Sequence, residues 1–109
     1  MTATEIPVRA LLNAQTGRIG WPELARHFAR GVVVCVAEGE DLLAVAERFV
    51  GDDAQDIEKL SRAGRLWRAQ DRDAGRWQQE QQARFWAVVV VPWVLVQEIG
   101  FEEEPSHAD

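Results

Sequence analysis

The chain has 109 residues, of which 47% are hydrophobic and 28% are charged, a composition typical of one globular domain rather than of a disordered chain. Its net charge of −6 at pH 7 argues against nucleic acid and anionic lipid as partners, because both are themselves negative. The single cysteine excludes an intramolecular disulfide and gives no sign of an oxidising compartment. The first residues lack the apolar core of a secretory signal, so we expect a cytoplasmic protein.

Composition along the chain predicts one domain followed by a short tail. We expect a single globular α+β domain over residues 1–101. Residues 102–109 begin with three consecutive glutamates and contain almost no apolar side chain, which predicts an acidic disordered tail. The longest apolar run, residues 85–96, is shorter than the ~20 residues that a helix needs to cross a bilayer. We therefore expect no membrane partner.

Apolar spacing and turn residues predict two helices and a strand in the first third of the chain. Residues 7–18 carry apolar side chains at helical spacing, which predicts the first helix. A second helix begins at Pro22, whose fixed φ suits the first helical position, and ends at Gly31. The β-branched run over residues 32–36 then predicts a short buried strand.

Capping residues predict two further helices. Asp41 and Asp53 each precede a segment with an apolar stripe, so both occupy expected N-cap positions. Gly51 and Gly64 follow these segments and are expected to end them. Asp56 lies in the first turn of the second segment, where its charge favours the helix dipole.

The last third of the domain holds an ambiguous segment, a helix and the clearest strand. Residues 65–72 favour neither helix nor strand, whereas residues 73–83 are predicted to form a helix with Trp77 turned inward. Residues 85–97 are rich in valine without alternation, which predicts one strand covered on both faces. Pro92 cannot donate a ladder hydrogen bond, so it indicates an edge, a bulge or a break. The elements together predict an α+β fold, with several helices packed on a small sheet of two to three strands.

One candidate site is an arginine series with helical spacing: Arg62, Arg65, Arg68, Arg72 and Arg76. Guanidinium groups interleaved with tryptophans bind anionic partners, because they hold phosphates and carboxylates and stack on rings. The simpler interpretation is a set of ordinary ion pairs, in a segment that Gly64 and Gly75 interrupt. No RNA- or DNA-binding motif accompanies the series, so we do not expect nucleic acid as the partner.

Residue types that serve catalysis or metal binding are scarce. His27 and Cys35 are too few for a zinc site, which needs about four ligands. The acidic clusters at 38–41 and 52–56 do not match a calcium loop and are explained as helix caps. We therefore predict no catalytic residue, no metal and no cofactor, and lean toward a protein that is not an enzyme.

Several polar and aromatic side chains in apolar surroundings are candidate residues for binding a ligand or partner. They are Asn13, Gln15, Trp21, His27, Trp93 and Gln97. A buried polar side chain needs hydrogen-bond partners, so such residues either line a pocket or bond to nearby backbone. Tryptophan is frequent in interface hot spots and is also an efficient core filler, so we expect most of them in the core and one or two at an interface.

Three stretches of the chain resemble a bacterial family known as domain of unknown function 2288. They are LLNAQTGRIGWPELARHFARG (11–31), EDLLAVAERFVGDD (40–53) and RFWAVVVVPWVLVQE (84–98). The resemblance covers nearly the whole chain except the tail. It implies a small bacterial, cytosolic, single-domain protein, and it carries over no functional residues because the family has no assigned activity.

The observations favour a non-enzymatic protein-interaction module that self-associates as a homodimer. An unidentified protein is a further possible partner. The basis is the apolar segment 85–97, because an exposed strand edge in a small sheet needs covering and a second copy can cover it. One alternative is a small-molecule binder or unrecognised enzyme with a pocket near Asn13, Gln15, His27 and Gln97. The other is a binder of an anionic partner through the arginine series.

Overall fold

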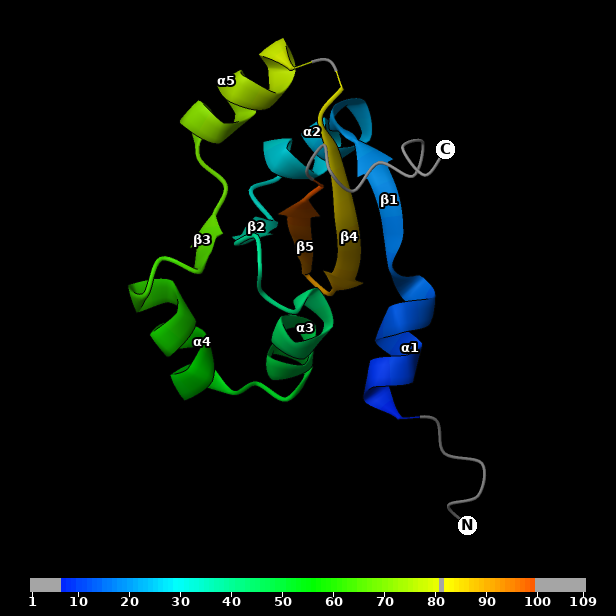
Figure 1. Cartoon of the computed structure of the whole chain (residues 1–109), viewed down its shortest axis with the longest axis vertical. Coiled ribbons are helices and arrows are strands. Elements are labelled where there is room, and N and C mark those ends of the chain that lie inside the picture. The colour runs from blue at the N-terminus through cyan, green and yellow to red at the C-terminus, as the bar shows by residue number, and fades with distance from the viewer. Residues whose placement is uncertain (1–6, 81, 100–109) are drawn as a thin grey trace.

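The computed structural model describes residues 7–80 and 82–99, which form a small compact α+β domain (Figure 1). The helices are α1 (Val8–Gln15), α2 (Trp21–Ala29), α3 (Leu42–Val50), α4 (Ala54–Arg62) and α5 (Asp71–Gln79). The strands are β1 (Gly17–Gly20), β2 (Val33–Val36), β3 (Leu66–Arg68), β4 (Arg84–Val90) and β5 (Trp93–Glu98). The tail predicted over 102–109 lies outside the described residues.

The strands form one sheet in the order β1-β4-β5-β2-β3. All neighbours are antiparallel except β2 and β5, which run parallel at the centre. The α+β class is confirmed, but the expectation of two to three strands is wrong, since the described residues form a 5-stranded sheet. The two strands without a clear sequence signal, β1 and β3, are the edges.

The segment predicted as one strand over residues 85–97 is a hairpin. The chain reverses at Val91 and Pro92, and β4 and β5 pair from Phe85↔Glu98 to Val90↔Trp93. Pro92 therefore marks a break between two strands. The valine run continues through this turn, so the hydrophobic pattern alone gives no sign of the reversal.

The helix predicted over residues 7–18 is shorter than expected. It ends at Gln15, and the next residues form β1, which pairs with the start of β4. The ambiguous segment 65–72 contains β3, which pairs with β2. Both strands are short, at 4 and 3 residues, so they owe their conformation to a partner distant in sequence.

The predicted caps of α3 and α4 are confirmed. The Asp41 carboxylate accepts hydrogen bonds from the backbone N–H groups of Leu43 and Ala44, and Asp53 accepts one from Asp56. Gly64 follows α4 at φ 75°, a left-handed conformation that favours glycine. Helix α5 covers Asp71–Gln79 rather than 73–83, and it continues through Gly75, which therefore does not interrupt it.

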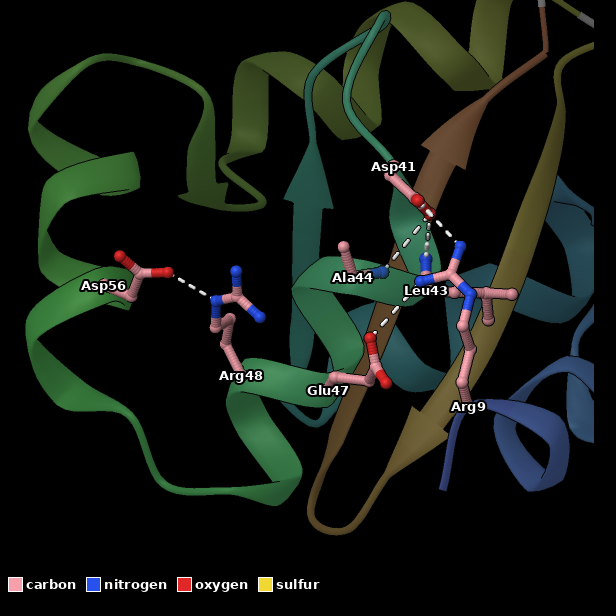
Figure 2. A network of polar contacts seen from close by, with 7 residues as sticks. All are labelled: Arg9, Asp41, Leu43, Ala44, Glu47, Arg48 and Asp56. Atoms are coloured by element: carbon pink, nitrogen blue, oxygen red, sulfur yellow. Dashed lines mark hydrogen bonds and ion pairs between the residues drawn. The ribbon is translucent and has the colours of Figure 1, made fainter. Parts of the chain in front are cut away.

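One face of the sheet is covered by α1, α3 and α4. The buried residues of this α3 core are Leu12, Val34, Val36, Leu42, Val45, Ala46, Leu66, Val88 and Leu95. At the surface, Arg9 of α1 pairs with Asp41 at 2.7 Å and with Glu47 at 3.3 Å, which ties α1 to α3 (Figure 2). Arg48 of α3 pairs with Asp56 of α4 in the same view.

The opposite face is covered by α2 and α5. These two helices lie in the upper part of Figure 1, above α1, α3 and α4. The buried residues of this Trp77 core are Leu24, Val33, Cys35, Trp77, Phe85, Ala87, Val94 and Val96. Trp77 is 1% exposed, which confirms its inward orientation. Its ring meets Phe85 edge-on at 4.9 Å between centroids, an arrangement favoured for aromatic pairs. Among the described residues, no helix has the length and apolar character to cross a membrane.

Candidate functional site

A hollow of about 300 Å³ opens at the carboxyl ends of the parallel strands β2 and β5. Its lining residues are Cys35, Val36, Ala37, Glu38, Gly64, Trp67, Trp77, Val96 and Glu98. The carboxyl ends of parallel strands are a common position for ligand sites, because the connections there leave a crevice. Two indole rings and two carboxylates around apolar strand residues give this aromatic hollow its chemical character.

Glu98 is the most highly connected polar residue of the aromatic hollow. Its carboxylate accepts hydrogen bonds from Arg76 at 2.6 and 3.2 Å and from the Trp77 indole N–H at 3.0 Å. Burial tends to raise the pKa of Glu98, but these hydrogen bonds outweigh it and hold the pKa below its ordinary value. Glu98 thus stays ionised at neutral pH and fastens α5 to the end of β5.

Cys35 lies at the floor of the aromatic hollow and is 4% exposed. Burial, together with the negative charges of Asp73 and Glu98, raises the pKa of its thiol to about 12. The thiolate is the nucleophilic form of cysteine, so the protonated thiol is a poor nucleophile at neutral pH. The chemistry available here is therefore binding through apolar and aromatic surfaces.

The four polar residues predicted to share a pocket do not line the aromatic hollow. Asn13 and Gln15 are exposed on α1. His27 is half-buried on α2 and its Nδ1 lies 3.1 Å from Arg30. Gln97 of β5 donates two hydrogen bonds to backbone carbonyls of the connection between β2 and α3, at 2.9 and 2.8 Å. Gln97 thus stabilises local backbone, one of the two roles considered from the sequence.

The two tryptophans predicted as binding residues both contact the cores. Trp21 packs against Trp77 at 5.7 Å and against Phe28 at 6.1 Å between ring centroids. Trp93 packs against the α3 core, and the Arg68 guanidinium lies over its ring at 5.1 Å. Both side chains are half-buried, so each retains some accessible surface.

The arginine series does not lie on one helix. Arg62 belongs to α4, Arg65 and Arg68 lie before and in β3, and Arg72 and Arg76 belong to α5. Within the part of the chain that the structure describes, four of the five form hydrogen bonds. Arg62 bonds Glu58 and Arg65 bonds Glu40, while Arg68 donates to the Gly31 carbonyl and Arg76 to Glu98. The helical spacing of the arginines therefore does not place them on one surface, because they lie in three different elements or next to them.

One surface feature had no counterpart in the sequence prediction, and a second was expected only as an exposed strand edge somewhere in the segment 85–97. The first is a hollow of about 270 Å³ lined by Arg18, Ile19, Gly20 and Arg84, beside the half-exposed ring of Trp86. The second is the end of β4, where Val89 is 49% exposed and Val91, which follows the strand, is 85% exposed. Both features depend on β1, whose pairing with β4 could not be read from four residues with two glycines.

The described residues contain no group of three or more His, Cys, Asp or Glu side chains arranged to hold a metal ion.

A family model with the description "Protein of unknown function (DUF2288)" matches residues 7–98. The chain is also similar to the solution NMR structure of PA1075 from Pseudomonas aeruginosa, with 34% identity over 95% of each chain and a TM-score of 0.76. No curated protein matches the chain.

Proposed function

The chain belongs to the DUF2288 family of proteins of unknown function, and from this premise we propose that it is a non-enzymatic interaction module of the bacterial cytoplasm that self-associates. The observation that carries the proposal is the open end of β4. The pairing of β1 with β4 stops at Gly17↔Ala87, while β4 continues to Val90. Residues 88–91 therefore form an apolar edge without a β1 residue opposite them.

The backbone of this edge is oriented for pairing. The Ile99 N–H donates to the Arg84 carbonyl, so Arg84 and every second residue after it direct their backbone groups toward β5. Val89 consequently directs its N–H and C=O groups away from β5, past the end of β1, whereas Val91 lies in the turn that follows. An exposed strand edge of this kind can pair with a strand of another chain. Two copies of the same edge can pair with each other around a twofold axis.

The side chains of the open edge supply an apolar contact. Val89 and Val91 are exposed although they belong to the most apolar segment of the chain. Fully burying a valine contributes roughly 1.5–3 kcal/mol, so two copies of both side chains can offset a large part of the cost of association. A twofold pair therefore uses both the polar backbone and the apolar surface of this edge.

Light scattering of Val89→Lys/Val91→Lys tests the self-association. Lysine at a strand edge opposes pairing by charge repulsion, so the variant is expected to have the mass of one chain where the natural protein has the mass of two. The matched control is Val50→Lys, which places lysine on the equally exposed Val50 at the end of α3 and should leave the mass unchanged. A natural protein that is monomeric at both low and high salt would exclude this function.

The aromatic hollow supports a second candidate function, the binding of a small organic cation. The observation that favours it is the half-buried Trp67 indole beside the Glu38 and Glu98 carboxylates, since aromatic faces and negative charge attract cations. The Trp77 ring is 1% exposed and already has the Arg76 guanidinium over it at 5.8 Å, so its indole N–H serves as a reporter on Glu98. Titration with tetramethylammonium is expected to shift the indole N–H signals of Trp67 and Trp77 in NMR spectra, while Trp93 serves as the internal control. Equal shifts of all three signals, or none at matched salt, would exclude the candidate.

A further inference from the structure

The hollow beside β1 carries two positive charges on one face of the sheet. Arg18 of β1 and Arg84 of β4 both line it, and both side chains are exposed. Neither arginine has a carboxylate partner within residues 7–80 and 82–99, in contrast to Arg9, Arg48, Arg65 and Arg76. Two guanidinium groups without an anion favour an anionic occupant.

The shape of this face follows from the register of β1 and β4. Arg18 lies opposite Trp86 and Gly20 lies opposite Arg84, and residues two apart on a strand share a face. The Arg18 guanidinium lies over the Trp86 ring, 5.3 Å from its centre. Gly20 has no side chain, so no β1 side chain separates Arg84 from the outer edge; Pro22 Cδ at 3.6 Å and the Ala83 carbonyl oxygen at 3.8 Å are the nearest atoms to the position that a Cβ of Gly20 would take.

The backbone of β1 offers hydrogen bonds at the same place. β1 is an edge strand and is outermost in Figure 1. Its pairing with β4 uses Gly17 and Ile19, because these residues lie opposite Ala87 and Phe85, whose backbone groups face β1. The N–H and C=O groups of Arg18 therefore point outward, where an extended peptide can add as a further strand.

We propose that the edge of β1 binds an extended acidic peptide segment of a partner protein, with carboxylates two residues apart held by Arg18 and Arg84. Side chains at i and i+2 of an added strand lie on one face, about 6.6 Å apart. One carboxylate then lies beside Arg18, and the next lies over the space left by Gly20, within reach of Arg84. This inference goes beyond the proposed self-association, which uses a different part of β4.

The charge distribution favours an acidic peptide over nucleic acid. A strand-like peptide needs only a few carboxylates and gains backbone hydrogen bonds from β1, whereas nucleic acid relies mainly on many phosphate contacts. A chain with a net charge of −6 repels a long polyanion more strongly than a short peptide. Arg18 and Arg84, which have no carboxylate partner among the described residues, match the few carboxylates of such a peptide.

The test is fluorescence anisotropy with a labelled peptide of alternating Thr and Glu residues and the protein comprising residues 1–109 at low salt. Arg18→Glu and Arg84→Glu are each expected to weaken binding about tenfold or more. Arg72→Glu makes the same charge change on α5 and should change the affinity less than about twofold. A peptide of the same composition in which adjacent Glu pairs alternate with adjacent Thr pairs is expected to bind more weakly, because none of its carboxylates lie two residues apart on one face. Val89→Lys/Val91→Lys should bind the alternating peptide as the natural protein does.

A second measurement needs no variant and therefore remains informative if a variant does not fold: the amide NMR signals of the natural protein during peptide addition. Peptide addition is expected to shift the signals of Gly17–Gly20 and of Arg84. Absence of peptide binding, equal affinity for the peptide of alternating Glu and Thr pairs, or shifts confined to other elements would contradict the proposal.

The other possible occupants of the β1 edge give distinct results. Tighter binding of single-stranded oligothymidine than of the peptide would assign the surface to nucleic acid. A lower particle mass of Arg18→Glu would assign it to a second copy. A gain in peptide affinity of about tenfold after changing Glu102, Glu103 and Glu104 to Gln would assign it to the chain's own carboxylates. Each of these three results would overturn the proposal of an acidic peptide partner.

Discussion

The Glu98 carboxylate connects two parts of the chain that the sequence gives no reason to associate. It accepts hydrogen bonds from Arg76 and Trp77 of α5, about twenty residues earlier. The inward orientation of Trp77 was predictable from apolar spacing, but its hydrogen-bond partner was not. A partner across the fold depends on how a helix lies on the sheet, and a local pattern carries no information about that placement.

The low pKa of Glu98 predicts a pH-dependent contribution to stability. Because its pKa in the folded state is below the ordinary value, the contribution is fully present above the unfolded-state pKa and is lost as the pH falls through the folded-state pKa. Glu98→Gln is expected to cost about 1 kcal/mol at pH 7, a value discounted for partial exposure, and clearly less near pH 3. Urea unfolding at both pH values measures the difference.

A matched control for Glu98 is Glu58→Gln. Glu58 pairs with Arg62 on the surface of α4, and their side chains are 63% and 78% exposed. Exposed pairs of this kind contribute little, so we expect a change below about 0.5 kcal/mol at either pH. A cost of Glu98→Gln that is equal at pH 3 and pH 7 would contradict an ionic contribution.

Among the elements, helices with a side-chain cap were predicted well and short edge strands were not. The N-caps of α3 and α4 and the glycine after α4 are local signals, because each satisfies backbone groups within a few residues. β1 and β3 carry no such signal, since their backbone bonds go to β4 and β2. The hairpin of β4 and β5 was missed because valines continue into its turn.

Asp41 is expected to stabilise α3 mainly as a cap. Its carboxylate accepts two backbone hydrogen bonds and also pairs with Arg9, whose hydrogen bond holds the pKa of Asp41 below its ordinary value (Figure 2). Asp41→Ala removes both functions and should cost about 1 kcal/mol, whereas Asp41→Asn keeps the capping oxygen and should cost much less. Urea denaturation compares the two variants, and equal costs would show that the ion pair, not the cap, is the stabilising contact.

At the scale of the whole molecule, the α+β class followed from the mixture of helix and strand signals, whereas the number and order of strands did not. Two cores lie on opposite faces of the sheet, and residues of β2 alternate between them, as Val34 and Cys35 show. The sequence of a strand buried on both faces is a continuous apolar run, and such a run does not indicate which strands lie beside it in the sheet. The candidate sites depend on which strands are neighbours, so the hollow beside β1 could not be predicted from the sequence.

Cys35 offers a probe of how this sheet opens as a unit. It lies on β2 between β3 and β5, and its thiol has a pKa raised to about 12 by burial. We expect labelling by a disulfide reagent at pH 8 to be slow and to accelerate with urea along the global unfolding curve. Ser61→Cys in a Cys35→Ala background places a thiol on the exposed Ser61 of α4 and should label rapidly. Native-state labelling of Cys35 at the rate of that control would show local opening of β2.

The strand order also determines when the sheet can form during synthesis on the ribosome. Of the described strands, β4 and β5 are made last, and the pairing described for β1 is with β4 alone, more than sixty residues later in the chain. Until residues 84–98 have left the ribosome, only β2 and β3 can pair, and the apolar faces of α1, α2 and α3 have no complete sheet to cover. Prematurely terminated chains are therefore expected to expose apolar surface and to be substrates for chaperones and proteases.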